Sequence, residues 1–150
     1  MQTRRKQFSI RRASKASRDR TLWCDTPSYL GAAEGICMLV RHFLQQIRMP
    51  YLVFSTELIV RECLNNAIHH GNNGDPDKRI KLRVTAARES IRVSVADQGR
   101  GFEWRKFVNR QPPSGSECTG RGLAVIGAYA SHVAFNRKGN VITVEINDKP

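Results

Sequence analysis

Apolar residues recur at helical spacing in two stretches of the first half of the chain. In 27–49 they are Leu30, Ala33, Ile36, Cys37, Val40, Phe43, Leu44 and Ile47. That spacing predicts an amphipathic helix with Pro27 in its first turn and Pro50 ending it. In 55–71 the apolar stripe is Leu58, Ile59, Cys63, Leu64, Ala67 and Ile68. A second helix is predicted there, capped by Ser55 or Thr56 and ended by Gly71.

The apolar pattern then changes to a period of two. Segments 79–87 and 90–97 alternate apolar with polar residues, and the two-residue gap between them predicts a hairpin. Segments 132–137 and 140–147 alternate in the same way, and 21–24 has room for one more short strand. Segment 98–120 is rich in Gly, Pro and Ser and is predicted to be mainly loop, ahead of a short helix at 121–131.

These elements predict the fold class. About three helices and four or five mostly antiparallel strands form an α/β (α+β) two-layer sandwich, with the helices on one face of a mixed sheet. A length of 150 residues fits one domain.

Positive charge is concentrated at the N-terminus. The formal net charge is +12, and residues 1–20, with eight Lys or Arg and one Asp, hold +7 of it. We expect a flexible basic tail at 1–20 and a single domain at 21–150. Such a tail attracts nucleic acid, anionic lipid or acidic protein. Because nothing else favours nucleic acid, direct nucleic-acid binding is not expected, and Trp23 and Trp104 are interpreted as packing or interface residues.

The remaining composition indicates a cytoplasmic protein. The cysteines, which are Cys24, Cys37, Cys63 and Cys118, lack CxxC spacing and fit a reducing compartment. No apolar run is long enough to span a membrane, and no apolar segment of a secretory signal follows the basic start. His69 and His70 are interpreted as polar helix-end residues, since no ligand cluster accompanies them.

The second predicted helix carries a carboxylate and an amide in its middle, Glu62 and Asn66. They are four residues apart and therefore share one face of the helix. If buried, they need polar partners or water. Taken alone, the pair indicates no more than the solvated face of an amphipathic helix.

A first glycine motif, DQGRGF, follows the strand predicted at 90–97. Asp97 at the strand end can accept a hydrogen bond from an exocyclic amino group such as that of adenine. Gly99 and Gly101 remove side chains where a ligand would pass. The alternative is a plain turn, because D-x-G sequences are common.

A second glycine motif, TGRGL, leads into the helix predicted at 121–131. Free backbone N–H groups at a helix start bind phosphate, and the alternative is a glycine-capped helix. No GK[ST] follows, which excludes a Walker A loop, and hairpin-type strands exclude a Rossmann βαβ unit.

The order of the motifs is more specific than any one of them. E-x-x-x-N-A on a helix, D-x-G-x-G after a strand and G-x-G-L opening a helix resemble the GHKL ATPase superfamily. Its members include type II topoisomerases, sensor histidine kinases and anti-sigma serine kinases. The resemblance runs through ECLNNAIHHG, VADQGRGF and TGRGLAVI and covers roughly residues 22–147. The small size and the pairing of ECLNNAIHHG with GRGLAVIGAYASHV are most similar to the anti-sigma factor serine/threonine-protein kinase branch. The resemblance implies a Bergerat-type fold that holds ATP or ADP between the helices and the glycine loops.

The resemblance also implies a role for each matching residue. Asn66 matches the asparagine whose amide oxygen holds Mg²⁺, and Glu62 matches the glutamate proposed as general base. Asp97 matches the adenine-reading aspartate. The other implied nucleotide-binding positions are Gly99, Gly101, Thr119, Gly120, Arg121, Gly122 and Leu123. Residues 103–119 would form a lid over ATP, and Arg121 or Arg100 would neutralise phosphate charge.

The function that the resemblance implies is an ATP-dependent protein serine/threonine kinase in a partner-switching module. It would bind a sigma factor in one state and phosphorylate a STAS-type anti-anti-sigma antagonist in another. One alternative is a non-catalytic, nucleotide-dependent binding regulator. Another is the ATP-binding domain of a sensor histidine kinase, although no long helical hairpin with a phosphoacceptor His precedes residue 27. Dimerisation, which is frequent among similar proteins, stays open.

Overall fold

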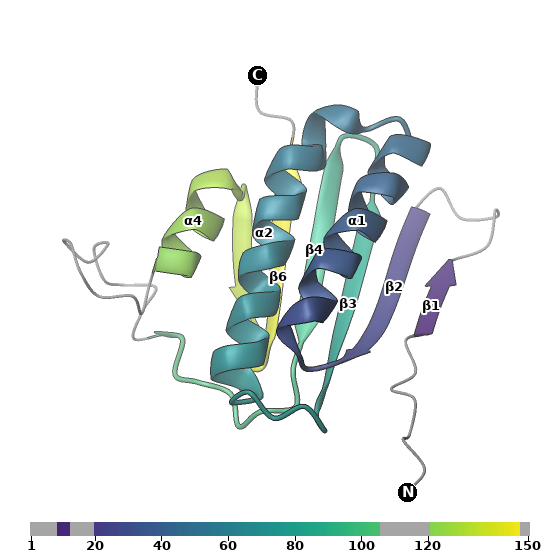
Figure 1. Ribbon diagram of the computed structural model, residues 1–150. Coiled ribbons are helices and arrows are strands. Elements are labelled where there is room, and N and C mark those ends of the chain that lie inside the picture. Colours follow the sequence, from purple (N-terminus) through teal and green to yellow (C-terminus); the bar gives the residue numbers. More distant parts are fainter. Residues whose placement is uncertain (1–8, 13–19, 106–120, 148–150) are drawn as a thin grey trace, which may run out of the picture.

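The computed structural model describes residues 9–12, 20–105 and 121–147 (Figure 1). Its six strands form one sheet in the order β1-β2-β3-β4-β6-β5. Their bounds are β1 Ser9–Arg12, β2 Arg20–Pro27, β3 Arg79–Ala86, β4 Ser90–Ala96, β5 His132–Phe135 and β6 Val141–Asn147. Every neighbouring pair of strands is antiparallel. A mixed, mostly antiparallel sheet was expected from the sequence, and the described sheet is antiparallel throughout.

The helices lie together on one face of this sheet (Figure 1). They are α1 Leu30–Gln46, α2 Val53–Asn66 and α4 Arg121–Tyr129, with a 3₁₀ turn η1 at Pro50–Leu52 and a π-helical turn η2 at Ala67–Gly71. The predicted two-layer α/β sandwich is therefore confirmed. Among the described helices, none combines the length and apolar composition that crossing a bilayer requires.

The core lies between the two layers and follows the predicted periodicities. The sheet contributes alternate residues such as Leu82 on β3 and Val93 on β4, and the helices contribute Ile36, Val40 and Ile59, all of them buried. Burying a side chain of this size stabilises a fold by roughly 1.5–3 kcal/mol. This packing fixes α2 against the sheet and so fixes the position of its polar residues.

Two predictions about helix starts are wrong. Pro27 ends β2, and α1 begins three residues later at Leu30. Helix α2 begins at Val53, because the chain runs straight into it from the 3₁₀ turn that Pro50 opens. Neither predicted cap is therefore at the helix end. Ser55 lies inside α2 and its hydroxyl donates to the Leu52 carbonyl at 3.3 Å.

The strands next to the N-terminus are longer and more numerous than the sequence pattern indicated. β2 pairs with β3 from Arg20↔Ala86 to Pro27↔Arg79, twice the length predicted for this strand. Ser9–Arg12, which was assigned to the flexible tail, forms β1 on the outer edge of β2. An edge strand offers free N–H and C=O groups, and β1 satisfies those of β2. The rest of the predicted tail, 1–8 and 13–19, lies outside the described residues.

Candidate functional site

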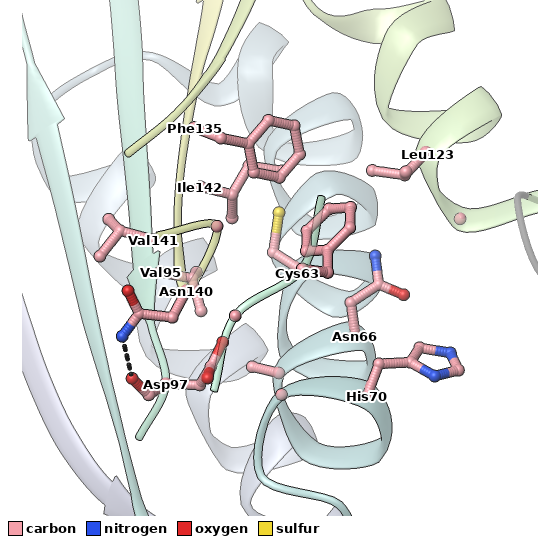
Figure 2. A pocket seen from close by; sticks show the side chains of 16 residues that line it. Cys63, Asn66, His70, Val95, Asp97, Leu123, Phe135, Asn140, Val141 and Ile142 are labelled. Carbon is pink, nitrogen blue, oxygen red and sulfur yellow. Dashed lines mark hydrogen bonds between the residues drawn. The ribbon is translucent and has the colours of Figure 1, made fainter. Parts of the chain in front are cut away.

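A cavity of about 280 Å³ opens between the helix layer and one end of the sheet (Figure 2). Its walls come from α2, η2, the segment after β4, the start of α4 and the β5–β6 hairpin. Most of the lining is apolar, from residues such as Val95, Phe135 and Ile142, and a few polar side chains project into it. A concave, largely apolar site with few polar groups is typical of small-molecule binding.

Half of the ten predicted site residues line this cavity. They are Asn66, Asp97, Gly101, Gly122 and Leu123. Glu62, Gly99 and Arg121 do not line it, although Glu62 and Gly99 lie directly beside residues that do. Thr119 and Gly120, with most of the predicted lid, lie outside the described residues.

Glu62 and Asn66 face the first turn of α4. A Cβ on Gly122 would lie 2.9 Å from Glu62 Oε2, 3.3 Å from Asn66 Oδ1 and 3.4 Å from Asn66 Nδ2. Only a glycine lets the two helices come this close without displacing the polar pair. The pair is half-buried and points at a helix start whose N–H groups have no intrahelical partners. An anion at this place would meet those N–H groups and the Asn66 amide, whereas the Glu62 carboxylate would repel it unless a cation lies between them.

Asp97 is held from both sides where β4 ends. Its N–H donates to the Asn140 carbonyl at 3.0 Å, and its own carbonyl accepts from Asn140 Nδ2 at 3.0 Å (Figure 2). Carboxylate oxygen Oδ1 accepts from the Gly99 N–H at 2.7 Å. Among the described residues, no group donates to Oδ2. The carboxylate is therefore fixed in the cavity wall with one oxygen available to a ligand.

The half-buried setting of Asp97 raises the pKa of its carboxyl group. Loss of solvent is the main cause, and the Gly99 N–H and the positive charges of Lys138 and Lys78 oppose it. The pKa of Cys63, which also lines the cavity, rises to about 12 by burial, so this thiol is inert packing. The cavity thus offers one carboxylate acceptor in a largely apolar wall.

The glycines around Asp97 permit close backbone packing. A Cβ on Gly71 would lie 2.5 and 2.7 Å from the Asp97 oxygens, and one on Gly99 would overlap the Gly71 carbonyl. Gly101 has φ +78°, and a Cβ there would overlap the Lys138 carbonyl. Gly99 and Gly101 were both expected to remove side chains where a ligand would pass. Gly101 lines the cavity, whereas Gly99 packs against the Gly71 carbonyl at the end of η2.

Asn72 is a positioning residue that the sequence analysis missed. It is fully buried, its Oδ1 accepts from the Gln98 N–H at 2.8 Å, and its Nδ2 donates to the Arg79 carbonyl at 3.1 Å. Its own N–H reaches the Ala67 carbonyl at 2.7 Å and closes the π-helical turn that follows Asn66. Such turns are frequent at functional sites. Asn72 joins the end of η2 to the loop that carries Asp97.

An aromatic wall closes the cavity on the hairpin side and was also missed. Phe102 packs edge-on against Phe135, with ring centroids 5.3 Å apart, and Trp104 stacks on Phe135 at 5.7 Å. Trp104 also donates its indole N–H to the Asn136 carbonyl at 3.0 Å. Phe102 and Phe135 line the cavity, and Trp104 supports them from behind. No spacing rule connects residues this far apart in sequence.

The comparisons with known proteins agree with this geometry. Residues 26–146 match a family model described as a histidine kinase-like ATPase domain. The match spans both helices that precede the hairpin, all of the cavity and the last strand. No curated protein matches the chain.

Proposed function

Because the chain belongs to the histidine kinase-like ATPase domain family, we propose that it is an ATP-dependent protein serine/threonine kinase that serves as an anti-sigma factor. One observation carries the proposal. Glu62 and Asn66 on α2 contact the start of α4 at one edge of the cavity. Asp97, which directly follows β4, lines the cavity from the sheet layer. That arrangement separates a base-binding end from a phosphate-binding end.

We assign the adenine ring to the apolar end of the cavity. Asp97 Oδ2 can accept a hydrogen bond from the adenine amino group, while Val95, Ile142 and the aromatic wall contact the ring. Guanine presents a carbonyl oxygen where adenine presents the amino group, so the carboxylate would repel it. Asp97 is therefore the proposed determinant of base selectivity.

We assign Mg²⁺ and the phosphates to the edge formed by Asn66 and α4. Mg²⁺ takes oxygen ligands and commonly uses one or two protein groups, with water and phosphates completing its shell. Asn66 Oδ1 fits this requirement, and Glu62 lies beside it. Bound there, the ion would neutralise charge on the transferring phosphate. Among the described residues, no cluster of three His, Cys, Asp or Glu exists.

The proposed chemistry is transfer of the γ-phosphoryl group to a Ser or Thr hydroxyl. A bond forms between that hydroxyl oxygen and the γ-phosphorus, the bond from γ-phosphorus to the bridging oxygen breaks, and ADP leaves. Glu62 lies one helical turn before Asn66 and accepts the hydroxyl proton. The Gly122 and Leu123 N–H groups at the start of α4 hold the phosphates for in-line attack. Arg121 is exposed and would contribute charge only.

The proposed partners rest on the order of the motifs in the sequence. We propose that a sigma factor binds in one nucleotide state and that a STAS-type anti-anti-sigma antagonist is the phosphorylated substrate. Copurification from native cells, followed by mass spectrometry of phosphorylated sites, identifies candidates for both. The same purification reports whether the chain forms a homodimer.

The decisive test uses purified protein, the antagonist identified in this way and ATP labelled at the γ-phosphate. Glu62→Gln keeps the shape and removes the proton acceptor. It should still bind ATP, while transfer falls by roughly 10²–10⁴-fold, the range usual for general base catalysis. Glu57→Gln is the matched control on the same helix, because Glu57 pairs with Arg41 and is not among the described residues that line this cavity. It should keep near-normal transfer.

The outcomes separate the proposed kinase from the alternatives. A wild-type protein that binds ATP but labels no antagonist would indicate a non-catalytic nucleotide-dependent regulator. Label on a histidine instead of a serine or threonine would indicate a sensor histidine kinase domain. Full activity in Glu62→Gln would leave the kinase in place and remove Glu62 from its mechanism.

A further inference from the structure

A second hollow of about 440 Å³ adjoins the nucleotide cavity at Gly101 and Phe102, which line both. It is lined by the segment 100–105 together with Arg137 and Lys138 of the β5–β6 turn. We propose that this basic pocket binds a phosphate-bearing anion, and that its occupancy is coupled to the nucleotide cavity through Phe102 and Phe135. Only the coupling rests on the nucleotide-binding function proposed above.

The charge balance of the basic pocket is the first observation. Four cationic side chains line it, those of Arg100, Arg105, Arg137 and Lys138, against the single carboxylate of Glu103. Elsewhere in the described chain, some arginines pair with carboxylates, namely Arg41 with Glu57, Arg61 with Glu34 and Arg92 with Glu145. Among the residues that the structure describes, no ion pair joins a carboxylate to the four pocket cations, although the charge of Lys138 also acts on the Asp97 carboxylate. Counted over the described residues, the basic pocket therefore has an excess of positive charge.

The kind of ligand follows from the donors. Three of the four cations are guanidinium groups, whose fork of N–H groups matches phosphate and carboxylate oxygens two at a time. The pocket is open, and one exposed ion pair in water contributes little. A phosphate group carries about −1.5 to −2 charge and three acceptor oxygens, so it satisfies several donors at once where a lone carboxylate does not.

The connection to the nucleotide cavity is the second observation. Gly101 and Phe102 line both hollows. Arg105 lies over the Trp104 ring, 4.7 Å from its centroid, and Trp104 stacks on Phe135, which lines the nucleotide cavity. An anion that binds Arg105 acts on this stack and holds Phe102 and Phe135 in the positions that form the cavity wall. Bound anion should therefore tighten nucleotide binding.

Trp104 provides a direct readout. The chain has two tryptophans, so Trp23→Phe leaves Trp104 as the only one. In that background, inorganic pyrophosphate is titrated without Mg²⁺ at constant ionic strength, and Trp104 fluorescence is followed. We expect a saturable change that is weakened about ten-fold or more by Arg137→Glu with Lys138→Glu.

The matched control reverses two charges elsewhere. Lys81→Glu with Arg88→Glu changes the net charge equally, and both residues are exposed and line neither hollow. This variant should bind pyrophosphate within about two-fold of its parent. If both variants bound pyrophosphate equally more weakly, the binding would be general charge attraction and the proposed site would be overturned. The absence of a saturable change in Trp104 fluorescence in the parent would also overturn it.

Two further arms identify the source of the phosphate and test the coupling. A phosphoserine peptide that binds more tightly than pyrophosphate, while its unphosphorylated form does not bind, supports a protein-borne phosphate, and the reverse order supports a small anion. By calorimetry, saturating pyrophosphate should lower the ADP dissociation constant about five-fold in the parent and not in the Arg137→Glu, Lys138→Glu variant. Weaker ADP binding in both would be competition for the nucleotide phosphates and would overturn the coupling. Absence of any ADP binding would overturn the proposed nucleotide site, while the fluorescence titration would still decide the anion site.

Discussion

Replacing Asn72 by alanine should damage both the stability of the fold and the nucleotide site. The side chain is fully buried, and its two hydrogen bonds satisfy the Gln98 N–H and the Arg79 carbonyl. Alanine leaves both backbone groups without that partner. Each of these part-buried hydrogen bonds contributes about 0.5–1.5 kcal/mol, so the free energy of unfolding should fall by roughly 1–3 kcal/mol.

The same change should weaken nucleotide binding. Gln98 is the residue between Asp97 and Gly99, and its N–H is tied to η2 only through Asn72 among the described residues. Freed from that tie, the Asp97 carboxylate is less well aligned with the base. Loss of one well-aligned hydrogen bond corresponds to about 0.5–1.5 kcal/mol, or roughly a two- to ten-fold higher ADP dissociation constant.

Urea unfolding followed by circular dichroism measures the first effect, and calorimetry with ADP on the folded fraction measures the second. Asn73→Gly is the matched control in the same turn. Asn73 is exposed with φ 58°, a conformation that glycine adopts freely, so stability should change by no more than about 0.5 kcal/mol. An Asn72→Ala protein that unfolds at the wild-type urea concentration would refute the role given to these two hydrogen bonds.

Four further predictions concern the cavity wall. Asp97→Asn should lower the preference for ADP over GDP, because an amide can present its donor to the base, and equal wild-type affinities for the two would remove the role of Asp97. Only the ionised carboxylate of Asp97 accepts the hydrogen bond from the base, and its pKa is raised above the ordinary value of 3.8. On acidification, ADP affinity measured by calorimetry should therefore begin to decline at a higher pH than an ordinary aspartate would give. The same raised pKa means that the folded state binds the proton more tightly, so wild-type stability relative to Asp97→Asn should fall as pH rises from 3.8 through the folded pKa. Gly101→Ala should cost about 1–3 kcal/mol in urea unfolding from its positive φ alone, whereas Gly35→Ala, inside α1 with open space around it, should be neutral or stabilising.

The layers of the fold could be predicted from the sequence because each depends on local period. The 3.6-residue stripe of Ile36, Val40 and Leu44 and the alternation of Leu82 and Val84 both point their apolar residues into one core. Element ends were harder, because neighbours in space decide them. β2 continues to Pro27 since β3 offers it partners along its whole length, and β1 forms where β2 would otherwise be an open edge.

The chemical residues of the site were partly predictable, and their supports were not. Glu62, Asn66 and Asp97 stand out as polar groups at fixed spacing from glycines or from a strand end. Gly71 and Asn72 belong to a run of glycine and asparagine residues that is common in turns. The neighbouring sequence does not reveal that Gly71 contacts the Asp97 carboxylate or that Asn72 accepts a hydrogen bond from Gln98. Their importance arises from contacts between segments that are distant in sequence.

The residues that hold the loops of the site in place are neutral asparagine amides, which leaves the charged and polar groups in the cavity wall available to a ligand. Asn72, Asn136 and Asn140 satisfy the backbone of two loops. Asn72 and Asn140 bond to Gln98 and Asp97 in the segment after β4, and Asn136 accepts from three N–H groups of the β5–β6 turn. Neutral amides do this without adding a charge to a largely apolar wall, where a charged support would compete for the carboxylate. Asp97 Oδ2 and the Asn66 amide are therefore left without hydrogen-bond partners among the described residues. Both residues are half-buried and can be reached by a ligand, so the site is arranged to favour one that offers an amino group at one end and a charged, oxygen-rich group at the other.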